Sequence, residues 1–331
     1  MYKVVDLLKS CRTYCKMVLF ILALVVVGVT TIPANNVSQR FSTWRLSPED
    51  YAFINNLPKP RGAGNLPGFK YIYIDASGTK SRNYDPSKQQ IQIAGSPRTS
   101  WEGVNAAADI IVKMTRYMPS PIFDNLVLKT SVGVFTAAEK LTIYPEYYNL
   151  ANTHCGSSCA GQCDITCTFD GRKYEDLVGV GGQRAVVLED NVLCTPGDPF
   201  HGTENILAHE FTHTIHVHGI SAMDQSNVYA AYLAAKNHQI WTPSSYAMTN
   251  EQEYFAEAAT VYFGINFSND NSGGMNMCRP GAFCSGEMAD RQHLYQTDTP
   301  LYNMLTYVFT NNRSQLASGL TVCPSGHSVI G

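Results

Sequence analysis

The sequence has few charged residues, and neither sign dominates. Asp, Glu, Lys and Arg make up 15% of the 331 residues, and the formal net charge is −3. Such low charge in a chain that is 44% hydrophobic excludes a disordered polyelectrolyte, and the lack of a basic excess excludes nucleic-acid binding through a basic surface. The composition also excludes a collagen or a coiled coil, and the sequence has no internal repeat. We therefore expect one large or two smaller globular domains and no nucleic-acid partner.

The sequence also lacks a hydrophobic run of full membrane-spanning length, but a shorter run lies near the N-terminus. Residues 17–32 (MVLFILALVVVGVTTI) are sixteen residues without a charge, with basic residues upstream and none downstream until Arg40. This charge order is typical of a segment whose N-terminus stays in the cytosol. Our favoured interpretation is that residues 17–34 form a signal anchor, which follows a cytosolic basic tail (1–16). This predicts a single-pass type II membrane protein. A signal peptide cut near Ala34, giving a secreted protein, and a buried core helix are the alternatives.

Both the anchor and the signal peptide would export residues 35–331, and the cysteines agree with export. Of ten cysteines, eight lie downstream of the hydrophobic run. An even number in an exported segment favours up to four disulfides, whose pairing the sequence does not fix. The eight candidates are Cys155, Cys159, Cys163, Cys167, Cys194, Cys278, Cys284 and Cys323. The spacing of the first four also permits a metal site, although oxidising surroundings favour disulfides. Three residues begin Asn-x-Ser triplets and are glycosylation candidates: Asn36, Asn266 and Asn312.

Hydrophobic patterns and turn residues predict the secondary structure. We expect strands at 69–75, 126–135 and 185–188, a cysteine-rich loop at 150–182, and helices at 101–117, from about 203 to 218, after Thr249 and at 301–309. Ser100 fits the cap of the first helix, and Thr249 with Gln252 fits a capping box. Because strands come early and helices late, the pattern predicts an α+β fold.

The helix expected to end at His218 contains an H-E-x-x-H pattern, His209-Glu210-Phe-Thr-His213. Residues four apart lie on one face of a helix, so His209 and His213 can bind one metal ion, typically zinc. A catalytic zinc site has three protein ligands and an open position for water, beside which Glu210 would accept a proton. His216 shares this face but lies too far along the axis to bind the same ion easily. We interpret it as a histidine behind the ligands or at the rim of the site.

The helix expected after Thr249 offers the third ligand. Glu253 and Glu257 are four residues apart and share one face. One of them could bind the metal while the other accepts a hydrogen bond from a ligating imidazole. Pairs of this kind are more often exposed to solvent, but the apolar residues between these two favour burial.

The stretch from Tyr246 to Ala258 (YAMTNEQEYFAEA), together with HEFTH at 209–213, resembles the protease domain of anthrax lethal factor and its relatives. These are gluzincins and include related uncharacterised secreted eukaryotic proteins; the resemblance covers residues 175–310. It implies a zincin-like metalloprotease domain with a small mixed sheet, an active-site helix and a mainly helical C-terminal lobe, which disulfides would stabilise here. It further implies these roles: His209, His213 and Glu253 hold one Zn²⁺, Glu210 is the general base, Tyr246 stabilises the oxyanion and Glu257 orients His209.

These observations predict a stalk or linker at 35–66 and a metallopeptidase domain at 67–331. The expected function is an extracellular or cell-surface zinc metalloendopeptidase, in which a zinc-activated water attacks the peptide bond and Glu210 is the general base. The expected partners are a peptide or protein substrate and, through residues 17–32 if they are uncleaved, a membrane. An extended substrate could pair with strand 185–188, as peptides do with edge strands. Two alternatives remain: a catalytically inactive metal-binding ectodomain, and a zinc hydrolase that acts on a non-peptide substrate.

Overall fold

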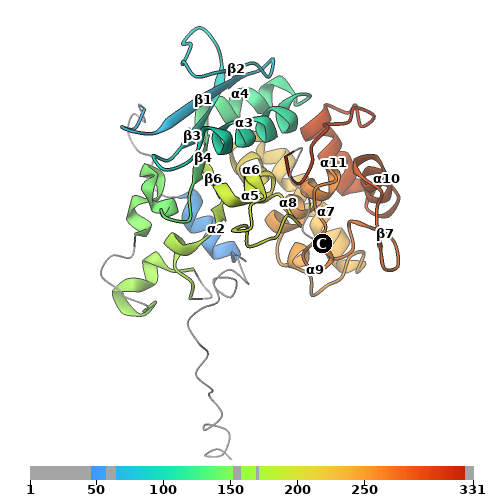
Figure 1. Cartoon of the computed structure of the whole chain (residues 1–331). Coiled ribbons are helices and arrows are strands. Elements are labelled where there is room, and N and C mark those ends of the chain that lie inside the picture. Colours follow the sequence, from blue (N-terminus) through green and yellow to red (C-terminus); the bar gives the residue numbers. More distant parts are fainter. Residues whose placement is uncertain (1–45, 57–64, 152–157, 169–170, 325–331) are drawn as a thin grey trace, which may run out of the picture. The chain divides into compact units, whose positions relative to one another are not determined.

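The computed structural model describes residues 46–56, 65–151, 158–168 and 171–324 (Figure 1). The expected basic tail, the hydrophobic run at 17–32 and Asn36 lie outside these residues, so their assignments stay predictions. Within the described part of the chain, no helix is both long and apolar enough to cross a membrane.

A six-stranded mixed sheet forms the first layer of the fold. Its strand order is β2-β1-β3-β4-β6-β5. The strands are β1 (Lys70–Asp75), β2 (Lys80–Ser81), β3 (Gln90–Gly95), β4 (Ser131–Phe135), β5 (Gly179–Val180) and β6 (Arg184–Leu188). The central strands β3, β4 and β6 are parallel, and β1, β2 and β5 add antiparallel neighbours. All residues of β4 and β6 are buried, as is usual for parallel strands with helices on the sheet.

Strand β6 confirms the strand expected at 185–188, but it does not lie at an edge of the sheet. Strand β5 pairs with it, with Gly179 opposite Val187 and Val180 opposite Val186. The prediction that a substrate could pair directly with 185–188 is therefore wrong, because those backbone groups already bond to β4 and β5.

Helices dominate the second half of the chain (Figure 1). The α-helices are α2 (Pro48–Asn55), α3 (Trp101–Thr115), α4 (Ser120–Lys129), α5 (Glu189–Leu193), α6 (Ile206–Thr214), α7 (Ala222–Asn237), α8 (Glu251–Tyr262), α9 (Asn269–Ser272), α10 (Glu287–Thr297) and α11 (Thr299–Thr310). Short 3-10 helices and the hairpin β7 (Met277–Arg279) and β8 (Ala282–Phe283) connect them. Helix α3 packs on β1 and β3, α6 packs on β6, and α8 packs between α6 and the helices α7, α10 and α11. The predicted α+β architecture, with a mainly helical C-terminal part, is confirmed.

Two expected elements are wrong in part. Residues 126–129 belong to α4 and not to a strand, because Pro121 starts a helix whose buried side chains Ile122 and Leu126 are four residues apart. The expected stalk at 35–66 contains α2, in which Tyr51 and Ile54 are at most 3% exposed. The domain therefore begins before residue 67, because part of this segment packs into the core.

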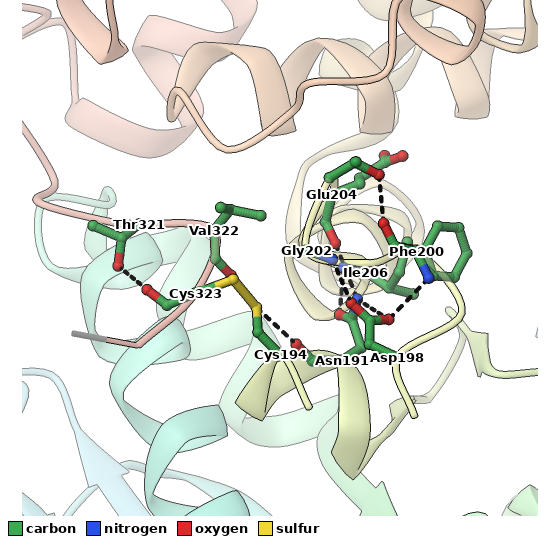
Figure 2. Close-up of a disulfide and its surroundings, with 11 residues drawn as sticks. Asn191, Cys194, Asp198, Phe200, Gly202, Glu204, Ile206, Thr321, Val322 and Cys323 are labelled. Atoms are coloured by element: carbon green, nitrogen blue, oxygen red, sulfur yellow. Dashed lines mark hydrogen bonds between the residues drawn. A yellow bond between two sulfur atoms is a disulfide. The ribbon is translucent and has the colours of Figure 1, made fainter. Parts of the chain in front are cut away.

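Disulfides join three pairs of the described cysteines: Cys159–Cys167, Cys194–Cys323 and Cys278–Cys284. Cys163 is also disulfide-bonded, and Cys155 lies outside the described residues. The expectation that these cysteines form disulfides is confirmed for the described part of the chain. The Cys194–Cys323 pair ties the segment after α5 to the C-terminal segment (Figure 2).

Candidate metal centre

Helix α6 carries the H-E-x-x-H pattern, and its N-terminus is fixed by two asparagines. Asn205 is the N-cap, and its Oδ1 accepts a hydrogen bond from the Ala208 amide. Asn191 of α5 accepts from the amide of Ile206 and donates to the carbonyl oxygen of Glu204 (Figure 2). The helix therefore begins at residue 206, three residues later than the sequence suggested, and Glu204 precedes it. It continues as a π-helix, η6 (Ile215–Gly219), which ends one residue after the expected end at His218.

The three predicted ligands meet in the core. The Nε2 atoms of His209 and His213 are 2.9 Å apart, and Glu253 Oε2 lies 3.1 Å and 3.4 Å from them, respectively. Two ligands of one tetrahedral zinc are roughly 3.3 Å apart when each bond is about 2.0–2.1 Å. Helix α8 supplies Glu253, and Asn250 fixes the start of that helix by accepting from the Glu253 amide. Thr249 is therefore not the cap, contrary to the expected capping box.

The donor atoms fit a metal ion chemically. The side chains of His209, His213 and Glu253 are all buried, and Glu253 Oε1 has no hydrogen-bond partner among the described residues. A buried carboxylate without enough donors is costly unless a cation balances it. The two imidazoles hold the pKa of Glu253 far below its usual value despite its burial. The site therefore contains a carboxylate and two nitrogen donors that converge on one point, as zinc requires.

Glu210 points into the same buried region. It is 1% exposed, and its carboxylate faces the backbone amide of Gly181. Burial raises the pKa of Glu210 to about 8, and nearby His209 opposes this rise. Gly181 lies against it so closely that a Cβ there would be 2.7 Å from the Glu210 carbonyl oxygen and 2.5 Å from the Cβ of His213. The chain after β5 thus passes directly beside the metal centre.

Tyr246 lies next to the ligands, on the short 3-10 helix η7 (Tyr246–Met248) before α8. Its ring is nearly parallel to the His209 ring, with centroids 6.2 Å apart, and it is fully buried. Burial, and the neighbouring charge of Glu253, raise the pKa of its hydroxyl. The hydroxyl therefore stays protonated at neutral pH and can act as a hydrogen-bond donor.

Two buried carboxylates lie behind His209. The Nδ1 atom of His209 faces Glu257 Oε1 at 3.5 Å and Glu204 Oε1 at 3.7 Å. Asn266 bridges the two carboxylates, donating to Glu257 Oε2 at 2.8 Å and to Glu204 Oε1 at 3.3 Å. The predicted position of Glu257 thus agrees with the structure, whereas the sequence analysis missed Glu204. The prediction of a glycan on Asn266 is wrong, because its amide is buried and hydrogen-bonded. Asn312 is exposed and stays a candidate.

Two further side chains surround the ligands. His216 lies on η6, where its ring packs against Phe255 at 5.5 Å between centroids, and burial lowers its pKa to about 3. It is neutral and packed behind the site. Tyr51 of α2 was not foreseen: its hydroxyl lies 2.8 Å from Nε2 of His213. This contact joins residues 162 positions apart, so no local sequence signal indicated it.

The comparison with protein families identifies the fold around this centre. Residues 87–270 match the family described as "Anthrax toxin lethal factor, N- and C-terminal domain". The chain belongs to this family. It is therefore a zincin-like zinc metallopeptidase that acts on peptide or protein substrates, and zinc is its metal, as the resemblance implied. The matched range includes the H-E-x-x-H helix and α8.

Similarity to a solved structure is also found, although at low identity. The PRO-PRO endopeptidase PPEP-2 from Paenibacillus alvei is 17% identical, over 65% of this chain and 95% of that chain, with a TM-score of 0.41. A search of curated protein sequences gave no match.

Proposed function

We propose that this chain is an extracellular or cell-surface zinc metalloendopeptidase whose zinc is held by His209, His213 and Glu253. The observation that carries the proposal is the convergence of these three buried donor atoms, 2.9–3.4 Å apart, on helices α6 and α8. When bound, zinc polarises the peptide carbonyl and makes water more acidic. The remaining steps fall to side chains that surround it.

Glu210 is the general base of the proposed reaction. The charges of His209 and Glu253 both act on its carboxylate, which therefore lies close to the ligands. Its buried surroundings favour the protonated form, so a captured proton can be held and later passed to the leaving amine. A positive ion at the ligands would lower its pKa and keep it ready to accept that proton.

Tyr246 is the proposed donor to the oxyanion that develops on the substrate carbonyl. Its hydroxyl is buried at the ligands and protonated at neutral pH. Such a donor stabilises the transition state more than the ground state because the charge is greatest there. The carboxylates of Glu257 and Glu204, 3.5 Å and 3.7 Å from His209 Nδ1, orient the His209 ring by their charge, which leaves Nε2 for the metal.

The extracellular location is proposed from the sequence and from the cysteines. Residues 17–32 have the charge order of a signal anchor. Three disulfides in the described residues are typical of chains that fold in an oxidising compartment. We propose a type II membrane protein, with a secreted form as the alternative. Labelling of intact cells with an impermeant reagent tests this location. A chain that is neither labelled on the cell surface nor found in the medium would contradict the proposal.

A peptide-library digest tests the activity. The zinc-loaded full chain is incubated with the library with and without a chelator. Both the wild type and Tyr51→Phe are used, since the Tyr51 hydroxyl contacts the ligand His213. We expect internal cleavage that the chelator abolishes and added zinc restores. Cleavage that is unchanged in the presence of the chelator would contradict the zinc mechanism. If zinc is bound but neither protein cuts any peptide, the inactive-ectodomain or non-peptide alternative replaces this proposal.

A further inference from the structure

Helix α2 brings a tyrosine into contact with one of the proposed metal ligands. Tyr51 is 1% exposed, and its hydroxyl oxygen lies 2.8 Å from His213 Nε2. The two rings are 4.4 Å apart between centroids. The 2.8 Å separation is close to the 2.9–3.4 Å separations among the three ligand atoms themselves. The Tyr51 oxygen is therefore close enough to His213 Nε2 to share an ion bound there, and Glu253 is also its neighbour.

The contact cannot persist unchanged when zinc is bound. A zinc ion on His213 Nε2 uses the lone pair of that nitrogen, so the nitrogen can no longer accept the Tyr51 hydrogen. The tyrosine hydroxyl must then bind the ion itself, donate to the neighbouring Glu253 carboxylate, or leave the site. Its environment favours staying, because the rest of α2 is held in place.

Helix α2 is fixed by contacts at both ends. Its N-terminus has a complete capping box, in which Ser47 and Asp50 bond each other's backbone amides. Asp50 also accepts a hydrogen bond of 2.7 Å from the Tyr174 hydroxyl, and Phe53 stacks on the same ring at 5.8 Å between centroids. At the other end, Ile54 packs on Gly182 so closely that a Cβ on the glycine would lie 2.9 Å from its Cγ2. Moving Tyr51 away would break these contacts together.

The same helix covers the path of a substrate. Gly181 and Gly182 follow the edge strand β5 and pass beside the metal centre, where an extended peptide would pair with the sheet. Ile54 lies on this segment. His209, Glu210 and His213 are each at most 2% exposed, so a polypeptide reaches them only when segments that cover them, such as α2 and the Gly181–Gly182 segment, move.

We propose that Tyr51 is a fourth protein ligand of the zinc, and that α2 thereby holds the peptidase in a latent form until the helix moves away. The proposal rests on the zinc site proposed above. Four protein ligands are the pattern of closed zinc sites, whereas a catalytic site keeps one position open. Displacement of α2 opens that position and uncovers the edge strand in one movement.

Copper substitution tests the ligand without reference to activity. Zinc in the full chain is replaced by Cu²⁺, because a tyrosine oxygen on Cu²⁺ gives a visible charge-transfer absorption that imidazole and carboxylate ligands do not give. The variants are Tyr51→Phe, Tyr246→Phe and the control Tyr73→Phe, which loses a buried hydroxyl in β1 that donates to Asn65. Each variant keeps its ring, so packing is retained.

We expect the absorption in the wild type, Tyr246→Phe and Tyr73→Phe, and its loss in Tyr51→Phe, which still binds one copper. An absorption that survives in Tyr51→Phe overturns the proposal, as does a wild type that binds copper through His213 without the absorption; both results leave the zinc site intact. If the wild type binds no metal, or if His213→Ala binds as much metal as the wild type, the zinc site is overturned and this proposal with it.

Peptide cleavage tests the latency. The zinc-loaded Tyr51→Phe protein should cut peptides about tenfold faster than the wild type or more, because a closed state that is favoured tenfold leaves roughly one molecule in ten competent. Tyr73→Phe should match the wild type. An unchanged rate in Tyr51→Phe overturns the latency. A lower rate with zinc still bound also overturns it, because Tyr51 would then assist the reaction.

Discussion

Glu210 decides, at the scale of single residues, whether this centre hydrolyses bonds or only binds metal. Glu210→Gln keeps the size of the side chain but removes the group that accepts the proton. We expect turnover to fall roughly 10²–10⁴-fold with zinc content unchanged, measured on peptides that the wild type cuts. Full activity in this variant would eliminate Glu210 as the general base. Because a wild type with very low activity would hide the effect, Glu210→Gln is also introduced into Tyr51→Phe and compared with Tyr51→Phe alone.

Tyr246 is expected to act on the reaction and not on metal binding. Tyr246→Phe keeps the ring that lies parallel to His209 and removes only the hydroxyl. Turnover should fall by about 10²–10³, as for the loss of one oxyanion donor, while zinc content stays at the wild-type level. Elemental analysis and kinetics check both parts. Zinc loss in this variant would make Tyr246 a ligand, and its role at the oxyanion would have to be given up.

The site residues on α6 and α8 were predictable from a local spacing signal, whereas Tyr246 was indicated by the family resemblance. His209 and His213 are four apart on one helix, and this spacing alone brings two nitrogens to one ion. Tyr51, Glu204 and Asn266 have no such signal. Their roles arise from contacts between distant segments, such as the 62 positions that separate the last two.

Elements with strong periodicity and clear caps were predictable. Strand β1 has a run of β-forming residues, and α3 has Ser100 as its cap and buries an apolar face. Strand β3 was missed although Ile91 and Ile93 alternate with polar residues. Helix α7 was missed although Ser221 and Asp224 form a capping box. Residues 126–129 were misassigned because β-forming side chains there continue a helix that tertiary packing stabilises.

The start of α8 gives a prediction at the scale of the element. Asn250 accepts from the amides of Gln252 and Glu253 at 2.9 Å, so it holds both the helix and a ligand. Asn250→Ala should lower the free energy of unfolding by about 0.5–2 kcal/mol and weaken zinc binding. Thr249→Ala is the matched control, because Thr249 is exposed and caps nothing. Chemical unfolding and zinc titration measure both; equal effects of the two changes would contradict the assignment of the cap.

The disulfides act at the scale of the whole molecule. Cys194–Cys323 closes a loop of 129 positions and ties the C-terminal segment to the region before α6 (Figure 2). We expect the downstream cysteines of the natively produced chain to be mostly oxidised. Thiol labelling under denaturing conditions, without reductant, should therefore find few free thiols among them. Eight reactive thiols would refute both the disulfides and the argument for export.

The zinc content of the purified full chain tests the central claim most directly. Glu253→Gln removes the carboxylate that joins α8 to the two histidines of α6, while Glu251→Gln removes one from the same helix outside the metal centre. The account predicts about one zinc per chain in the wild type and in Glu251→Gln, and a large loss in Glu253→Gln and in His213→Ala. Equal zinc in all four proteins, or none in the wild type after incubation with zinc, would contradict it.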